Sequence, residues 1–222
     1  ANPANTWELV DLTTQKFFNF LDVKPGDYGE DTISIHVGSN DAWMCAAARI
    51  TSDVDGTCTE PELADDPTCS AGPGLGELDS TLQFAFWADD GDNVYEPGTG
   101  TGGTPETIFL GGTLADMNNA GQIALASPSG GAFGTNPVPG DQTVYIGKIW
   151  CAGTLAPTNL GQDGLNTGSP LTLGTGFTCD GTLVNNASQT DEVQGDMQFY
   201  AVQARNNAQF SCTSYVPTWP VQ

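Results

Sequence analysis

An acidic segment between two apolar runs is the part of this sequence best suited to chemistry. Residues 89–96 read Asp-Asp-Gly-Asp-Asn-Val-Tyr-Glu. Carboxylate and amide oxygens around a glycine turn are the donors that a hard cation such as Ca²⁺ requires. The predicted ligands are Asp89, Asp92, Asn93 and Glu96. The misplaced glycine and the missing final acidic residue exclude an EF-hand, and because the same letters favour a turn, a solvated turn is the alternative.

The residues that most enzymes use are scarce or poorly placed. His36 is the only histidine, and the alternation of residues 32–37 predicts that it points outward from a strand. Neither a Ser-His-Asp triad nor a two-histidine zinc motif can therefore be built. A glycosidase needs two carboxylates in a cleft, and no pair stands out among the 27 acidic residues. We expect a protein that is not an enzyme, with a secreted hydrolase as the third-ranked alternative.

The charge balance restricts the partners. Asp and Glu number 27 against five Lys and Arg, which gives a formal net charge of −22. Such a surface repels phosphate backbones and anionic lipids, so we expect neither nucleic acid nor an anionic membrane as a partner. Copies of the chain also repel one another unless cations screen the charge. Calcium is the expected cation, and plain solubility or a saline habitat is the alternative.

The cysteines predict disulfides. The six are Cys45, Cys58, Cys69, Cys151, Cys179 and Cys212. Because no C-x-x-C occurs and histidine is nearly absent, disulfides are favoured over zinc, and a secreted, extracellular or cell-surface location is expected. Sequence alone leaves the pairing open, although Cys58 with Cys69 is the easiest pair to imagine across ten polar, turn-rich residues. The single glycosylation sequon begins at Asn186.

No stretch is apolar enough to predict a membrane span, which needs roughly 20 such residues. The sequence starts at Ala1 without a charged and apolar leader, and we expect any secretory signal to have been removed.

Short apolar runs between Gly- and Pro-rich turns predict an all-β fold. The strictest alternation places Ile33, Ile35 and Val37 on one face of a strand over residues 32–37. Other strands are expected over residues 6–13, 42–50, 78–87, 108–110, 122–126, 143–151, 171–179, 197–205 and 210–216. Residues 51–76 are expected to form a disulfide-pinned surface loop. Without repeats or heptads, the expected architecture is one β-sandwich domain with long loops.

Several motifs give the chain a family resemblance. They are DVKPGD at 22–27, GEDTISIHV at 29–37, NDAWMC at 40–45, and shorter stretches at 76–78, 86–93 and 203–207. These resemble the TasA and camelysin family of secreted proteins over roughly half of the chain. The resemblance implies a jelly-roll β-sandwich exported through a dedicated signal peptidase. Members form biofilm-matrix fibres or archaeal bundling pili and tubes, in which an N-terminal strand of one subunit completes a sheet of the next.

On this resemblance, the leading hypothesis is a structural subunit of an extracellular filament whose partners are identical subunits. Residues 1–13 would be the donor strand and residues 14–222 a single sandwich domain. The predicted donor anchors are Trp7, Leu9, Val10 and Leu12. The donor segment is shorter and the cysteines are more numerous than is usual in the family. The metalloprotease activity described for camelysin is not carried over, because this chain has no zinc motif.

The alternative hypothesis is a calcium-dependent, cell-surface carbohydrate-binding module. Tryptophan rings stack on sugars, although sandwich cores also use them. The five candidates are Trp7, Trp43, Trp87, Trp150 and Trp219.

Overall fold

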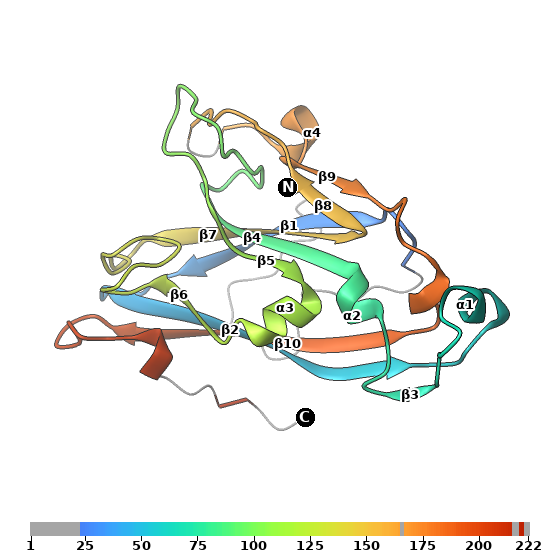
Figure 1. Cartoon of the computed structure of the whole chain (residues 1–222). Coiled ribbons are helices and arrows are strands. Elements are labelled where there is room, and N and C mark those ends of the chain that lie inside the picture. Colours follow the sequence, from blue (N-terminus) through green and yellow to red (C-terminus); the bar gives the residue numbers. More distant parts are fainter. Residues whose placement is uncertain (1–22, 165–166, 215–217, 220–222) are drawn as a thin grey trace.

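Two β-sheets pack face to face in the computed structural model of the chain (Figure 1). The structure describes residues 23–164, 167–214, 218 and 219. The predicted all-β fold is confirmed, because strands form both layers and the helices are single short turns at their ends. The finer jelly-roll assignment stays a prediction. The predicted donor strand, with anchors Trp7, Leu9, Val10 and Leu12, lies outside the described residues.

The first sheet has four antiparallel strands in the order β1-β7-β4-β5. Their bounds are Tyr28–His36 for β1, Thr143–Ala152 for β7, Leu82–Asp89 for β4 and Ile108–Thr113 for β5. Ile33 lies opposite Ile146, and Phe84 lies opposite Trp150. These side chains point into the sandwich, so the predicted inner face of residues 32–37 is confirmed and His36 is exposed.

The second sheet is built on the long strand β2, Ala42–Asp55. On one side β2 pairs with β10, Glu192–Gln203, and on the other with β6, Gln122–Ala126, and β3, Gly72–Pro73. Its buried side chains meet those of the first sheet in one apolar core. Phe86, Ile146 and Leu125 are 0% exposed there. Each such buried side chain contributes about 1.5–3 kcal/mol.

Short elements lie around both sheets. They are α1 (Glu60–Asp65), α2 (Leu78–Thr81), α3 (Leu114–Asn119), α4 (Pro170–Leu173), η2 (Asn186–Ser188), η3 (Cys212–Ser214), β8 (Thr154–Pro157) and β9 (Phe177–Asp180). Among the described residues, no helix is both long and apolar enough to cross a membrane.

Four expected elements are corrected by the structure. Strand β2 runs on to Asp55, because β10 and β3 pair with residues that the polar sequence had assigned to a loop. Leu78 lies in α2 rather than in a strand, since Asp191 accepts hydrogen bonds from the first backbone N–H groups of that helix. Residues 171–179 divide between α4 and β9 around Gly174 and Gly176, whose φ angles are +83° and +81°. In place of the expected terminal strand over residues 210–216, the described part forms η3.

All six cysteines form disulfides, as predicted. Cys58 bonds Cys69, which is the pair that the sequence favoured. Cys45 of β2 bonds Cys212 of η3, and Cys151 of β7 bonds Cys179 of β9. The last two connect segments 167 and 28 residues apart, so they tie the C-terminal part of the chain to both sheets. Three disulfides fit an extracellular or secreted protein.

A second, smaller core lies on the outer face of the first sheet. Trp87 is 0% exposed and packs against Tyr95 and Phe177, with ring centroids 5.8 and 5.5 Å away. Its indole lies directly over Gly147, its cross-strand neighbour, where an added Cβ would come within 2.1 Å of the ring. The aromatic cluster therefore requires a glycine at this position, and it fixes the start of the loop that follows β4.

We expect Gly147→Ala to destabilise the protein, because the new methyl group must displace the Trp87 ring from a packed site. Overpacking of this kind costs about 1–3 kcal/mol. Thermal unfolding followed by tryptophan fluorescence should show a clear loss of Tm. Gly38→Ala is the matched control, since a Cβ at Gly38 meets nothing within 4 Å. Equal Tm values for the two variants would contradict the packing described here.

Candidate functional site

Six carboxylates gather where β4 ends, and we call them the β4-end cluster. They form two groups, each with oxygens within 4.8 Å of one another: Asp89, Asp90 and Glu106 in one, Asp92, Glu96 and Asp163 in the other. Asp89 is the last residue of β4, and the loop between β4 and β5 supplies Asp90, Asp92, Glu96 and Glu106. Asp163 comes from a later loop, between β8 and α4.

Asp89 organises the loop that follows it. Its oxygens accept hydrogen bonds from the Trp87 indole at 3.2 Å and from the backbone N–H groups of Gly91 and Asn93. Asn93 turns the chain with φ +66°, a conformation that asparagine tolerates better than most residues. These contacts close residues 89–93 into a turn beside the Trp87 indole.

Glu106 closes the same loop from its far end. Its two carboxylate oxygens accept bonds from the backbone N–H groups of Asp90 and Glu96, both at 2.9 Å. Glu106 is 6% exposed and Glu96 is 1% exposed. The loop is therefore held by carboxylates that have been drawn out of water.

A glycine-rich contact brings the sixth carboxylate, Asp163, into place. The backbone of Gly98 donates to Leu160 at 2.7 Å, and the two segments run side by side from there. At Gly100 a Cβ would come within 1.7 Å of the Gln162 carbonyl oxygen, so the close approach requires glycine. The backbone N–H of Asp163 then donates to Glu96 at 3.3 Å.

Burial raises the pKa of several of these carboxyl groups. Removal from water, followed by the nearby negative charge of Asp92, raises the pKa of Asp89 to about 7. Desolvation is also the main cause that raises the pKa of Glu106 to about 8 and that of Asp92 to about 6. In the described part of the chain, no lysine or arginine forms an ion pair with any member of the cluster.

Three buried oxygens of the cluster have no hydrogen-bond donor in the structure: Oδ1 of Asp90, Oδ2 of Asp92 and Oδ1 of Asp163. A buried acceptor without a partner is unfavourable by about 1–3 kcal/mol, and more when it is charged. A cation in each group would give these atoms a partner. An all-oxygen, carboxylate-rich donor set fits a hard divalent ion such as Ca²⁺.

The four predicted calcium ligands do not converge on one point. Asp89 belongs to one group, whereas Asp92 and Glu96 belong to the other. The Asn93 side-chain oxygen accepts a 2.8 Å bond from the Thr32 hydroxyl. The sequence analysis missed Asp90, Glu106 and Asp163. Asp90 adjoins a predicted ligand and could have been included, but the other two arrive through tertiary contacts that no local motif encodes.

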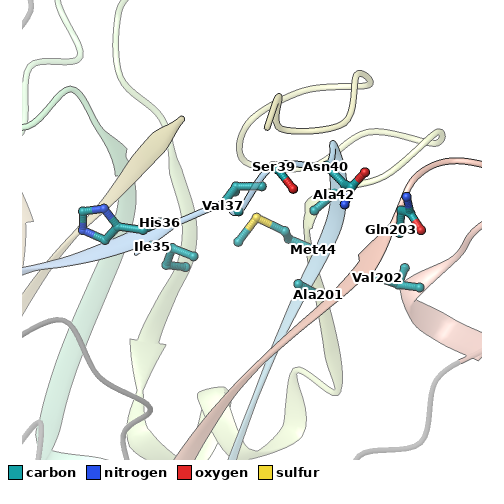
Figure 2. Close-up of a pocket in the computed structure, with 11 residues that line it drawn as sticks. Ile35, His36, Val37, Ser39, Asn40, Ala42, Met44, Ala201, Val202 and Gln203 are labelled. Carbon is teal, nitrogen blue, oxygen red and sulfur yellow. The ribbon is translucent and has the colours of Figure 1, made fainter. Parts of the chain in front are cut away.

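A second feature is a groove at one side of the sandwich, with a volume of about 410 Å³. Figure 2 shows Ile35, Val37 and Met44 gathered between the end of β1 and the β2–β10 pair, while His36 points the other way. Ala201 faces the same space from β10. The full lining is residues 35–40, Ala42, Met44 and residues 201–203, and it contains no carboxylate.

The remaining predicted site residues make other contacts. Trp43 and Trp87 are 6% and 0% exposed, so neither offers a ring face to a sugar. Trp219 lies under the Arg49 guanidinium, 4.5 Å from the ring centroid. Asn186 is exposed, and its side-chain nitrogen donates to Asp65 at 3.0 Å.

Comparison with known proteins adds no assignment. No protein-family model matches the chain. No curated protein matches it either.

We predict that the calcium-free protein becomes less stable as the pH rises from about 4 to 8. The pKa values of Asp89, Asp92 and Glu106 are raised in the folded state above their unfolded values of about 4. The folded state therefore holds more protons in this window, and its advantage is lost as they dissociate. Calcium should compete with the protons, so its stabilisation should be larger at pH 8 than at pH 5.5. Differential scanning fluorimetry with EDTA or CaCl₂ tests both statements, and a calcium effect independent of pH would contradict them.

We predict that Asp163→Asn weakens calcium binding by at least about tenfold, since it removes one charged donor from the cluster. Tb³⁺ is a suitable probe, because an ion in the β4-end cluster would lie close to the Trp87 indole, which can sensitise its luminescence. Displacement of Tb³⁺ by Ca²⁺ gives the affinity. Asp141→Asn is the control, as Asp141 is exposed and away from the cluster. Equal affinities in the two variants would exclude Asp163 as a ligand.

Proposed function

We propose that this protein is the structural subunit of an extracellular filament, assembled by donor-strand complementation and supported by calcium. Residues 1–13 of one subunit add to the open side of the next sandwich, as in the TasA-like fibres that the sequence resembles. The observation that carries the proposal is the long strand β10, which is an edge strand among the described residues, carries only two charged side chains and lies beside the apolar groove.

Edge strands normally carry features that prevent pairing with other chains, such as lysine, proline or short length. Strand β10 has twelve residues, contains neither lysine nor proline, and has no charged residue after Asp196. One of its sides pairs with β2, and in the described part of the chain no strand pairs with the other. Such an edge is a template for β-strand addition, in which backbone hydrogen bonds supply affinity.

The groove gives the added strand a place for its side chains. Ile35, Val37 and Met44 present apolar surface there, and Ala201 leaves room beside them. A strand whose alternate residues are large and apolar suits this surface. The segment Trp7-Glu8-Leu9-Val10-Asp11-Leu12 carries such residues. Because the donor and the acceptor are different surfaces, addition is head to tail and leads to an open filament.

Calcium has a defined task in this proposal. Subunits with a net charge of −22 repel one another at close range. Bound divalent ions reduce that charge and fix the β4-end cluster. At a free calcium concentration 100 times Kd, one site contributes about 2.7 kcal/mol to folding.

Removal of residues 1–13 is expected to leave a folded monomer that cannot polymerise, because the donor strand is gone while the sandwich is intact. Negative-stain microscopy and light scattering, with and without chelator, measure assembly. A synthetic peptide of residues 1–13 should bind the truncated protein, whereas a scrambled peptide of the same composition should not. Filaments formed equally well without residues 1–13 would refute the donor assignment.

A lysine on the edge should also block assembly. We expect Ala201→Lys to give a folded subunit with strongly reduced polymerisation, since it places a charge in the groove. Leu171→Lys is the matched control, because Leu171 is 98% exposed on α4, away from the groove. Assembly of both variants at the wild-type rate would place the acceptor elsewhere.

A further inference from the structure

We infer that the protein has a second divalent-cation site at the opposite end of β4, built from Asp55, Glu62, Glu77 and Asp191. These residues come from the end of β2, from α1, from the turn before α2 and from the segment before β10. Oxygens of Glu62, Glu77 and Asp191 lie within 4.8 Å of one another, and Glu62 also lies within that distance of Asp55. Glu62 is thus shared by both sets.

Asp55 gives the strongest reason to place an ion here. It is 2% exposed, and its Oδ1 atom has no hydrogen-bond partner. Its Oδ2 atom lies 3.1 Å from Cys69 Sγ and 3.8 Å from Cys58 Sγ. These sulfurs form a disulfide and carry no hydrogen, so neither can donate. Both oxygens of this buried carboxylate therefore lack a proton donor among the described residues.

Glu62 is in a similar position. It is 0% exposed, and its Oε2 atom accepts the backbone N–H of Thr59 at 3.1 Å in the cap of α1. Its Oε1 atom has only Cys69 Sγ at 3.1 Å, which again has no hydrogen to offer. Glu62 and Asp55 thus turn oxygens that lack donors toward the same small volume.

Asp191 adds a third such oxygen. Its Oδ2 atom caps α2 by accepting the backbone N–H groups of Glu77 and Leu78 at 2.6 and 3.1 Å. Its Oδ1 atom is buried and has no partner. Two ion pairs join described residues, Arg49 with Asp196 and Lys148 with Asp31, and neither reaches this cluster.

The donor atoms define the class of ion. All are carboxylate oxygens, which select hard cations, and the neighbouring sulfurs are oxidised and so unavailable as the thiolates that zinc would use. Calcium fits this set, and the shared Glu62 would connect the disulfide loop to the start of β4. The ion would fix the two loops relative to each other without contributing to the β4-end cluster.

Asp55→Asn tests the site, because its effect on Tm should differ between the calcium-free and the calcium-saturated protein. In EDTA the variant should have a higher Tm than wild type, because it removes a buried charge and adds N–H donors. In saturating calcium the variant should show a smaller calcium-induced rise in Tm and should bind one Ca²⁺ fewer per chain, measured by equilibrium dialysis and atomic emission. The Tb³⁺ luminescence sensitised by Trp87 should be unchanged, since the Trp87 indole contacts Asp89 of the β4-end cluster and the substitution lies at the other end of β4. Glu60→Gln, on the exposed side of α1, is the matched control and should behave as wild type.

A wild-type calcium count and an undiminished calcium-induced Tm rise in Asp55→Asn would overturn the assignment. Glu77→Gln is a second variant that leaves the α1 cap and the Asp55 environment in place, and it should also lose one ion. These measurements use the monomer in solution, so their outcome is independent of filament assembly.

Discussion

Carboxylates that are buried without a nearby cation impose the main constraint on this structure. They collect at both ends of β4, around Asp89 and Glu106 at one end and around Asp55 and Glu62 at the other. A charged group taken out of water is strongly unfavourable unless it is paired or protonated. Burial raises the pKa values of Asp89 and Glu106, so these groups tend to take up protons. Calcium would satisfy it at neutral pH while the carboxylates stay charged.

The rest of the fold fixes the positions of these groups. The apolar core between the sheets sets the direction of β4, and the Trp87, Tyr95 and Phe177 cluster holds the loop that leaves it. Glycines allow the Asp163 segment to approach closely. The Cys58–Cys69 bond closes the loop around α1, which connects β2 to β3. In this way apolar packing and covalent bonds hold in place like charges that repel one another.

Local patterns in the sequence were sufficient to predict the positions of most of the strands. Strict alternation identified the inner face of β1 at Ile33, and an apolar run identified β7. Local patterns gave the wrong secondary structure where tertiary contacts determine it. Polar residues at the end of β2 form a strand because β10 and β3 supply partners, and Leu78 starts a helix because Asp191, far along the chain, caps it.

The acidic loop shows the same limit. Its local composition predicted a cation site. In the structure, Asp89, Asp92 and Glu96 do lie among clustered carboxylates. The division into two groups depends on Glu106, at the far end of the same loop, and on Asp163, which arrives from another loop. The second cluster gave no signal at all, because its members lie on four separate segments and only folding brings them together. The family resemblance supplied the donor-strand hypothesis, which neither composition nor periodicity could supply.

The bond between Cys45 and Cys212 has a mechanical consequence. It joins the segment that follows β10 directly to β2, the central strand of the second sheet. A pulling force applied beyond Cys212 therefore passes through a covalent link into the middle of the sheet. It does not unzip β10 one hydrogen bond at a time, as it would if the tail were attached only through that strand. Strand β10 is thus shielded from tension that enters at the C-terminal side.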